Sequence, residues 1–333
     1  MAQVETARGP VDVARLGTTL MHEHVFVLNE EIRLNYPGDW DEEARIADAA
    51  AQLNALKRRG CDTIADPTVL GLGRDIRRVA EVAQRTDINI IVATGLYTYD
   101  EVPFYFRFRG RHSDSGADPM TTMFVADITD GVAGTGVKAA FLKCAIEEQG
   151  LTPGVERVLR AVATAHVATG APVTVHTHPG SRSGLEALRV LAEEDADLSR
   201  VVMGHSGDAT DLDYLTRLAD AGCLLGMDRF GLNALLPFEQ RVGTVAELAR
   251  RGYADRMVLS HDAACYIDWF RPDQIGAFAP DWHFGHLFDD VLPALLERGV
   301  SQAQIETMLV ANPRRYFSGP GGAAGEAAVA AGT

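Results

Sequence analysis

The sequence predicts an α/β protein, a closed (β/α)8 barrel, and three observations carry this prediction. Short apolar runs alternate with amphipathic stretches along most of the chain. Several of these runs end in residue types that bind metal ions. The chain has 333 residues, of which 47% are hydrophobic, so it can bury one large core. We therefore predict a single barrel domain over residues 1–318, with a metal centre at the carboxyl ends of its strands.

Eight short apolar runs are predicted to be strands. They span residues 19–25, 63–66, 88–94, 139–143, 173–176, 201–205, 224–228 and 257–261. Candidate ligands end five of these runs, and only closure of the sheet would bring the first and last runs together. This favours the closed barrel over its competitor, a doubly wound open sheet.

The stretches between the runs are predicted to be helices. They span residues 41–59, 75–85, 121–130, 153–169, 184–194, 211–221 and 244–251. In 153–169, for example, Val155, Val158 and Val162 recur at helical spacing, and charged residues occupy the opposite side. Two further helical stretches, 282–298 and 302–310, are predicted to pack against the outside of the barrel.

The two ends of the chain carry no sign of a membrane or secretory segment. Residues 1–10 are polar, without a basic region followed by an apolar one, and no apolar run approaches membrane-spanning length. Residues 319–333 are almost all glycine and alanine, which predicts a disordered tail. A cytoplasmic location is the expectation.

The net charge limits the classes of binding partner, and the spacing of the cysteines indicates their redox state. A net charge of -15 argues against binding to nucleic acid or to an anionic membrane surface, and a small neutral substrate fits better. The four cysteines, scattered without CxxC spacing, suit reduced thiols in a cytosolic protein.

Histidines at the ends of the runs suggest a metal-dependent hydrolase. His22 and His24 stand two apart in an extended segment, so both imidazoles point to the same side. His176, His205 and Asp262 end three later runs. A single such histidine is more often an ordinary hydrogen-bonding residue, but four at equivalent positions favour a metal site. His178 can face the same mouth beside the ligands, whereas His112, His166, His283 and His286 are expected to be surface or packing residues.

Lys143 is one of only three lysines and lies inside an apolar run. A buried ammonium without a partner is costly. A buried carboxylate would remedy this, as would addition of carbon dioxide to the neutral amine, which yields a carbamate able to bridge two cations. From residue type alone the ion pair is favoured, because carbamylation is rare.

Together these motifs resemble the phosphotriesterase family of the amidohydrolase superfamily. The likeness extends from about residue 6 to residue 317. It rests on His22-Glu23-His24, Lys143 and the segments 174–178, 204–208, 227–231, 260–262 and 312–317. Segments 93–99 and 102–106 resemble the phosphotriesterase-like lactonases in particular.

The resemblance implies a binuclear centre of two divalent cations, Zn, Co, Mn or Fe. It assigns His22, His24 and Asp262 to the more buried ion, His176 and His205 to the more exposed ion, and carbamylated Lys143 and a hydroxide to the bridge. The hydroxide would attack a lactone carbonyl carbon, and Asp262 would handle the proton. Tyr97 and Arg229 complete the implied catalytic set.

The expected activity is that of a lactonase for N-acyl-homoserine lactones, which are quorum signals, with promiscuous organophosphate hydrolysis. The segment after Asp262 is unusually apolar and is predicted to hold the acyl chain. The predicted pocket consists of Tyr97, Tyr99, Arg229, Cys265, Tyr266 and Trp269. By resemblance a homodimer is expected. The alternatives are a phosphotriesterase or other carboxylesterase as the main activity, and a metal-binding barrel without turnover.

Overall fold

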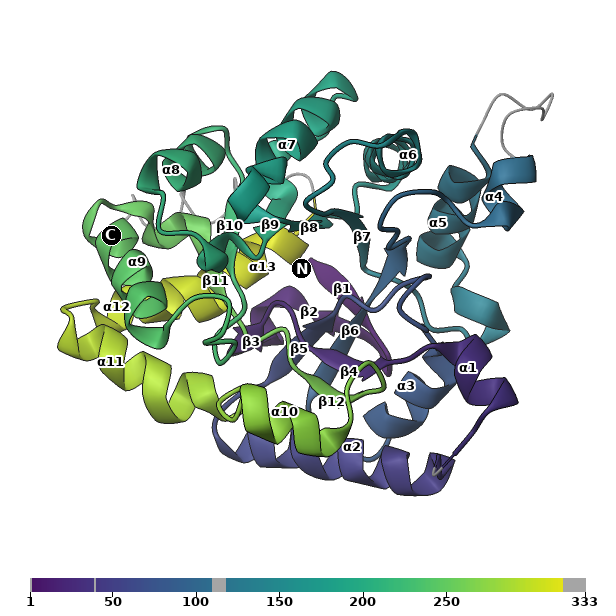
Figure 1. Ribbon diagram of the computed structural model, residues 1–333, viewed down its shortest axis with the longest axis horizontal. Helices are drawn as coiled ribbons and strands as arrows, with labels where there is room; N and C mark the ends of the chain where they lie inside the picture. The colour runs from purple at the N-terminus through teal and green to yellow at the C-terminus, as the bar shows by residue number, and fades with distance from the viewer. Residues whose placement is uncertain (1, 39, 110–117, 320–333) are drawn as a thin grey trace.

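A computed structural model of the protein describes residues 2–38, 40–109 and 118–319. Its centre is a sheet of eight parallel strands that curves into a barrel (Figure 1). In the order in which they pair, the strands are β3 (Thr19–Leu20), β5 (Thr63–Asp66), β6 (Asn89–Gly95), β7 (Phe141–Ile146), β8 (Val173–Thr177), β9 (Val201–Gly204), β10 (Leu224–Met227) and β11 (Met257–Leu259). All eight overlap the predicted runs, which confirms the (β/α)8 barrel.

The barrel closes between its first and last strands just beyond β3 and β11. There β4 (His24–Val27) pairs in parallel with β12 (Ala264–Ile267). The backbone N–H of His24 donates to the carbonyl of Ala263 at 2.7 Å, and that of Asp262 donates to the carbonyl of His22 at 3.0 Å. The closing hydrogen bonds therefore lie at the level of the predicted ligands.

A buried carboxylate strengthens this closure from behind. Glu23 is fully buried, and its Oε1 accepts hydrogen bonds from Ser260 Oγ at 2.9 Å and from His261 N and Nδ1 at 2.9 and 2.6 Å. Its Oε2 accepts from the backbone N–H of Ala263 at 3.0 Å. One side chain between β3 and β4 thus satisfies four donors in the segment between β11 and β12.

Helices surround the barrel, as the alternating pattern predicts (Figure 1). They are α2 (Glu42–Arg58), α3 (Ile76–Ala83), α5 (Pro119–Thr129), α6 (Pro153–Thr169), α7 (Ser183–Glu193), α8 (Leu212–Asp220), α9 (Phe238–Arg250), α11 (Leu292–Glu297), α12 (Gln302–Glu306) and α13 (Asn312–Phe317). The stretch predicted over 282–298 becomes helical only at Leu287 and begins with a π-helical turn, and a second such turn separates α12 from α13. The predicted start of α9 is also late, because the helix already begins at Phe238.

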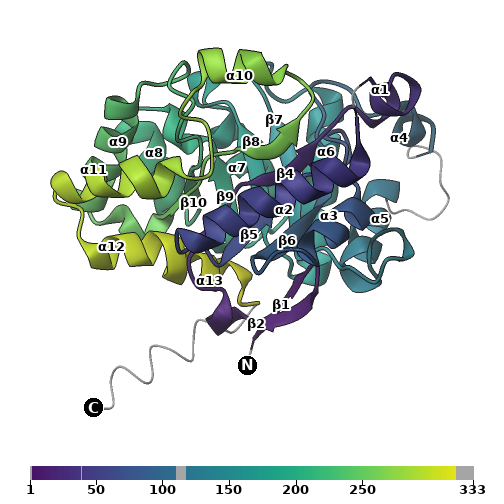
Figure 2. The ribbon, with the colours of Figure 1, turned by 90° about the horizontal axis from the view of Figure 1, so that it is seen from below.

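Several short elements escape the sequence pattern. They are the hairpin of β1 (Gln3–Thr6) and β2 (Gly9–Asp12), and the helices α1 (Glu30–Asn35), α4 (Phe104–Arg109) and α10 (Pro272–Phe278). Each is shorter than the eight residues or more over which periodicity becomes informative. Figure 2 shows α10 at one end of the barrel and α13 with the hairpin at the other.

The barrel interior is filled, so it is a core rather than a channel. Met21, Ile91 and Phe141 from the strands pack in one cluster with Tyr316 and Phe317 of α13. The hydroxyl of Tyr316 lies 2.9 Å from Thr174 Oγ1, where the C-terminal helix seals this end of the core. Space for a ligand therefore lies at the opposite end.

Two expectations concern residues beyond those that the structure describes. Residues 320–333 of the predicted tail and His112 lie outside the described residues. Among the helices that the structure describes, none combines the length and the apolar character needed to span a membrane.

We expect Glu23→Gln to lower the free energy of unfolding by about 3 kcal/mol, because the new NH₂ group would face donors that now meet a carboxylate. Urea unfolding of the metal-free protein, followed by circular dichroism, measures this. Glu43→Gln is the matched control, since the Glu43 carboxylate is exposed and pairs only with Arg85, and we expect little change. Equal stability of the two variants would contradict the role of Glu23.

Candidate metal centre

The six predicted ligands converge at the carboxyl ends of the strands. They are His22 and His24 around the break between β3 and β4, Lys143 in β7, His176 in β8, His205 directly after β9 and Asp262 after β11. His205 and Asp262 have φ angles of 65° and 56°. This left-handed backbone is unfavourable for residues with a Cβ, and it is typical of functional sites that the surrounding structure holds in place.

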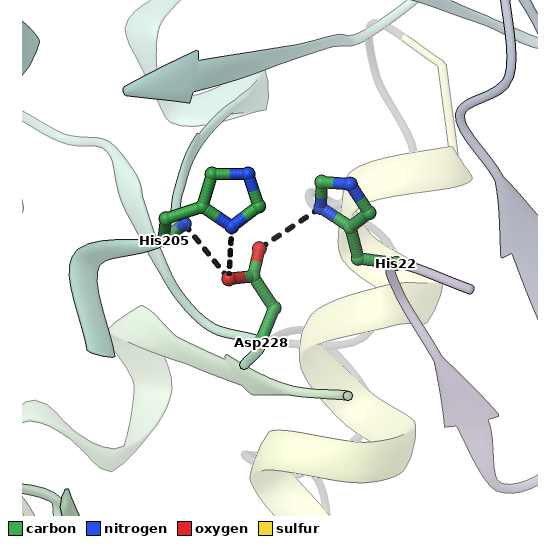
Figure 3. A group of neighbouring side chains, drawn as sticks. All are labelled: His22, His205 and Asp228. Atoms are coloured by element: carbon green, nitrogen blue, oxygen red, sulfur yellow. Dashed lines mark hydrogen bonds and ion pairs between the residues drawn. The ribbon is translucent and has the colours of Figure 1, made fainter. Parts of the chain in front are cut away.

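Asp228 orients two of the histidines. Its Oδ2 accepts from His22 Nδ1 at 3.0 Å, and its Oδ1 accepts from His205 Nδ1 at 3.0 Å and from the His205 backbone N–H at 2.7 Å. Figure 3 shows the carboxylate between the two rings. Because Asp228 already accepts three hydrogen bonds, it is better suited to orienting ligands than to binding the ion, although it groups with both histidines. Both rings therefore present an unprotonated Nε2 on their other side.

The other two histidines are held in the same manner. His24 Nδ1 lies 2.7 Å from Thr68 Oγ1, whose own hydroxyl donates to Asp66 at 2.5 Å. His176 Nε2 lies 2.8 Å from Glu147 Oε1. Each histidine thus donates a hydrogen bond from one ring nitrogen to an outer acceptor and has a lone pair on the other nitrogen.

These lone pairs face one another. His176 Nδ1 lies 2.8 Å from His205 Nε2, while His22 Nε2 and His24 Nε2 lie 3.3 and 3.2 Å from Asp262 Oδ1. Two acceptors at such distances repel unless a cation lies between them. The two spacings to Asp262 are close to the edge of about 3.3 Å that metal–ligand bonds of roughly 2.0–2.1 Å give in a tetrahedron, and the spacing between His176 and His205 is shorter. The donor set therefore fits divalent metal ions.

Burial favours the neutral form, which binds metals, for the imidazoles of His22, His176 and His205 by lowering their pKa values. It lowers the pKa of His22 to about 4, with a further contribution from Lys143. It also places the pKa of His205 well below its usual value. Neutral imidazoles at neutral pH are what coordination requires.

Lys143 is fully buried, and its Nζ lies 3.2 Å from His22 Nε2. Burial lowers the pKa of this amine to about 8, although Asp262 and Asp228 oppose the shift. Within the described part of the chain, no carboxylate oxygen forms an ion pair with Nζ. The ion-pair explanation for Lys143 is therefore not what the structure has, and the lowered pKa increases the fraction of neutral, nucleophilic amine.

Arg229 connects Asp262 to a second layer of charges. Its Nε donates to Asp262 Oδ2 at 2.9 Å, and its guanidinium reaches Asp208 at 3.1 Å. Asp208 also accepts from the fully buried Arg241, which in turn donates to the carbonyl of Leu232. Burial alone would lower the pKa of Arg229, but Asp262 and Asp208 hold it above its usual value. Arg229 therefore stays charged and cannot pass a proton from Asp262 to Asp208.

A cavity of about 420 Å³ opens above these ligands. Its floor is polar, and its walls are mostly aliphatic and aromatic. The lining includes Tyr97, Glu147, Arg229 and five of the ligands, and the walls are Val27, Leu72, Leu232, Ala234, Leu235, Ala264, Ile267, Trp269, Phe270, Phe278 and Trp282. The predicted pocket residues Tyr97, Arg229 and Trp269 are thus in place.

Three residues assigned to the pocket from the sequence lie elsewhere. Tyr99 is exposed, and its hydroxyl donates to Glu148. Cys265 is buried and turns its sulfur toward the carbonyl of Ala49 in α2, while Tyr266 packs against Trp40. β12 reaches the cavity through Ala264 and Ile267 instead, and neither Cys265 nor Tyr266 lines it. His178 also lies away from the ligands, where its ring contacts Ser181.

No role for Asp228 or Glu147 is predicted from the sequence. Asp228 follows the apolar run of β10, so its position at the end of a strand is the same signal that indicates the histidines. Glu147 comes after the strand end, in a loop with a second glutamate next to it, and nothing in the sequence separates the two. Only the folded chain shows which of them meets His176.

Comparisons with known proteins agree with this geometry. Residues 2–317 match the model of a family described as the phosphotriesterase family. A phosphotriesterase homology protein of Mycobacterium tuberculosis is 57% identical over 324 residues, covering 97% of this chain and 99% of that protein. An aryldialkylphosphatase of Saccharolobus solfataricus is 38% identical over 305 residues, covering 91% of this chain and 95% of its own.

The fold comparison gives the same result. The solved structure of the phosphotriesterase from Mycobacterium tuberculosis is similar with a TM-score of 0.93 at 57% sequence identity. The match covers 95% of this chain and 98% of that one.

We expect Asp228→Asn to weaken metal binding about 10–100-fold, a typical cost of losing an outer partner of a ligating histidine. The amide NH₂ would face a ring nitrogen of His22 or His205 and reverse its protonation. Zinc titration of the metal-free protein measures this. Asp220→Asn serves as control, because Asp220 accepts an exposed hydrogen bond from the hydroxyl of Tyr253, away from the predicted ligands. Unchanged zinc affinity in Asp228→Asn would show that the carboxylate does not orient the ligands.

Proposed function

Because the chain belongs to the phosphotriesterase family, whose members are metal-dependent hydrolases, we propose that this hydrolase acts on lactones that carry an apolar acyl chain. N-acyl-homoserine lactones are the class we favour, with phosphotriesters as secondary substrates. The observation that carries this proposal is the division of the cavity into a small polar floor and a long apolar wall. A compact ester ring fits the first, and a hydrocarbon chain fits the second.

The ligand chemistry supports hydrolysis. When bound, two divalent cations lower the pKa of a shared water and polarise the carbonyl of an ester. His22, His24 and Asp262 would hold one ion, and His176 and His205 the other. Lys143, as a carbamate, would supply oxygens to both.

The side chains around the floor have separate roles. Asp262 is a carboxylate of the cavity floor, and we assign it the proton that the opened ring takes up. Arg229 fixes Asp262 through Nε and stays charged, so its own N–H groups can bind a developing oxyanion. Tyr97 stands edge-on to His176 with ring centroids 5.2 Å apart, and it bounds the floor on that side.

Phosphotriester hydrolysis is the second candidate. The relative from Saccharolobus solfataricus is named an aryldialkylphosphatase, and the same water can attack phosphorus. The apolar wall from Ile267 to Phe278 favours the acyl lactone as the main substrate, because a compact triester leaves much of that wall uncovered.

We expect kcat/KM for N-acyl-homoserine lactones to rise about fourfold per methylene until the wall is covered, since each buried methylene contributes about 0.8 kcal/mol. Trp269→Ala should flatten this rise. The control is Phe104→Ala, which removes an exposed aromatic outside the cavity. If paraoxon outperforms every lactone by orders of magnitude, phosphotriester hydrolysis is the main activity and the lactonase assignment fails.

We expect reconstitution of the metal-free protein with zinc to be faster in bicarbonate than in buffer freed of carbon dioxide, because Lys143 must first become a carbamate. The measurement is the rate of zinc uptake. Lys143→Arg should show no bicarbonate dependence, since a guanidinium forms no stable carbamate. A zinc-uptake rate in the parent protein that is the same with and without bicarbonate would mean that Lys143 binds zinc unmodified or does not bind it.

A further inference from the structure

Glu147 occupies the junction between the ligands and the cavity. It follows β7 directly, four residues after Lys143, and its side chain is 19% exposed. It lines the cavity. Among the acidic side chains that hold the four histidines, Asp66 and Asp228 are almost completely buried. Glu147 alone of these three is partly open to the space where a substrate binds.

A single oxygen of Glu147 receives two donors. Oε1 lies 2.8 Å from His176 Nε2 and also accepts the hydroxyl proton of Tyr97. The two rings meet at nearly a right angle, 89° between their planes. The three side chains therefore form a closed triangle in which each ring is fixed both by Glu147 and by the other ring.

For His176, this contact decides which nitrogen can bind a metal ion. With the proton on Nε2, the lone pair stays on Nδ1, which faces His205 Nε2 at 2.8 Å. Without an acceptor at Nε2, the ring loses the contact that selects this protonation state and orientation. The other three histidines keep their own outer partners and are not affected.

For Tyr97, the same contact fixes the direction of the hydroxyl. Its proton is committed to Glu147, so its oxygen can offer only a lone pair to a molecule in the cavity. The ring position along the cavity wall is fixed at the same time.

We propose that Glu147 is a positioning residue that couples one metal position, the one held by His176 and His205, to the orientation of Tyr97 in the substrate cavity. This inference rests on the metal-holding part of the proposed function and not on the choice of substrate. Loss of the Glu147 acceptor should therefore weaken one of two metal ions and disturb Tyr97 together.

The chain offers a matched control in the next residue. Glu148 accepts a hydrogen bond from Tyr99 at 3.0 Å, which makes a second Glu–Tyr pair beside the first. Tyr99 is exposed, and neither residue lines the cavity. Changes that act only through loop structure or surface charge should affect both pairs alike.

The first measurement is zinc titration of the metal-free parent, Glu147→Leu, Glu147→Gln, Tyr97→Phe and Glu148→Leu. We expect Glu147→Leu to weaken one of two zinc ions about 10–100-fold and to leave the other within about twofold. Glu147→Gln retains an acceptor oxygen and should recover most of the loss. Tyr97→Phe and Glu148→Leu should bind zinc like the parent.

The second measurement is KM at saturating zinc for whichever of a lactone and paraoxon the parent protein hydrolyses faster. Glu147→Leu and Tyr97→Phe should each raise KM, and the double variant should raise it no more than the larger single effect, because both remove one contact. Glu148→Leu should not change KM.

Three outcomes would overturn the proposal: equal weakening of both zinc ions in Glu147→Leu, the same zinc loss in Glu148→Leu, or additive KM effects. If Glu147→Leu does not fold, Glu147→Asp is the decisive variant. Its side chain is shorter by one methylene, so its carboxylate should no longer reach His176. Unchanged affinity for both zinc ions in this variant would also refute the coupling. A parent protein that takes up no zinc would instead overturn the metal-dependent function itself.

Discussion

The closing of the barrel between its first and last strands is the constraint on which the site depends. His22 and Asp262 stand far apart in the sequence, yet backbone hydrogen bonds between their segments place both beside Lys143 and His205. Glu23 stabilises this closure, because its carboxylate accepts hydrogen bonds from the backbone N–H groups of His261 and Ala263. Glu23, the residue between His22 and His24, therefore stabilises the fold, and the two histidines contribute to the metal centre. The same three-residue segment does both.

A layer of acidic residues around the histidines accounts for their behaviour. Asp228, Glu147 and the Thr68–Asp66 pair each take up an imidazole N–H, and the lone pairs turn inward as a result. Without that layer, two facing nitrogens such as those of His176 and His205 would separate or hydrogen-bond to each other. Repulsion among the inward acceptors is what a cation relieves, so the protein folds into a state that is already poised to bind metal.

The sequence predicts the strands and the side chains that meet at their ends, but it does not predict the walls of the cavity well, for a physical reason. A buried parallel strand must be apolar, and a ligand at its end interrupts that run, so residues such as His176 and His205 stand out. Contacts across the barrel leave no such mark. Glu147 and Glu148 are indistinguishable in the sequence, and Cys265 looks as suitable for the cavity as Trp269 does. The direction of each side chain depends on where β12 begins, which the apolar pattern does not determine.

Arg241 fixes one part of the loop after β10 and leaves another part of the same loop exposed. Its buried guanidinium holds Asp208 and the carbonyl of Leu232, so the base of the loop after β10 is tied to the floor. At the tip of that loop, Leu235 is 58% exposed while still lining the cavity. Exchanges at the tip therefore cost little stability and leave the ligands in place. Natural variation can reshape substrate range at this loop while the reaction chemistry is inherited unchanged, which makes the fold a readily evolvable catalyst.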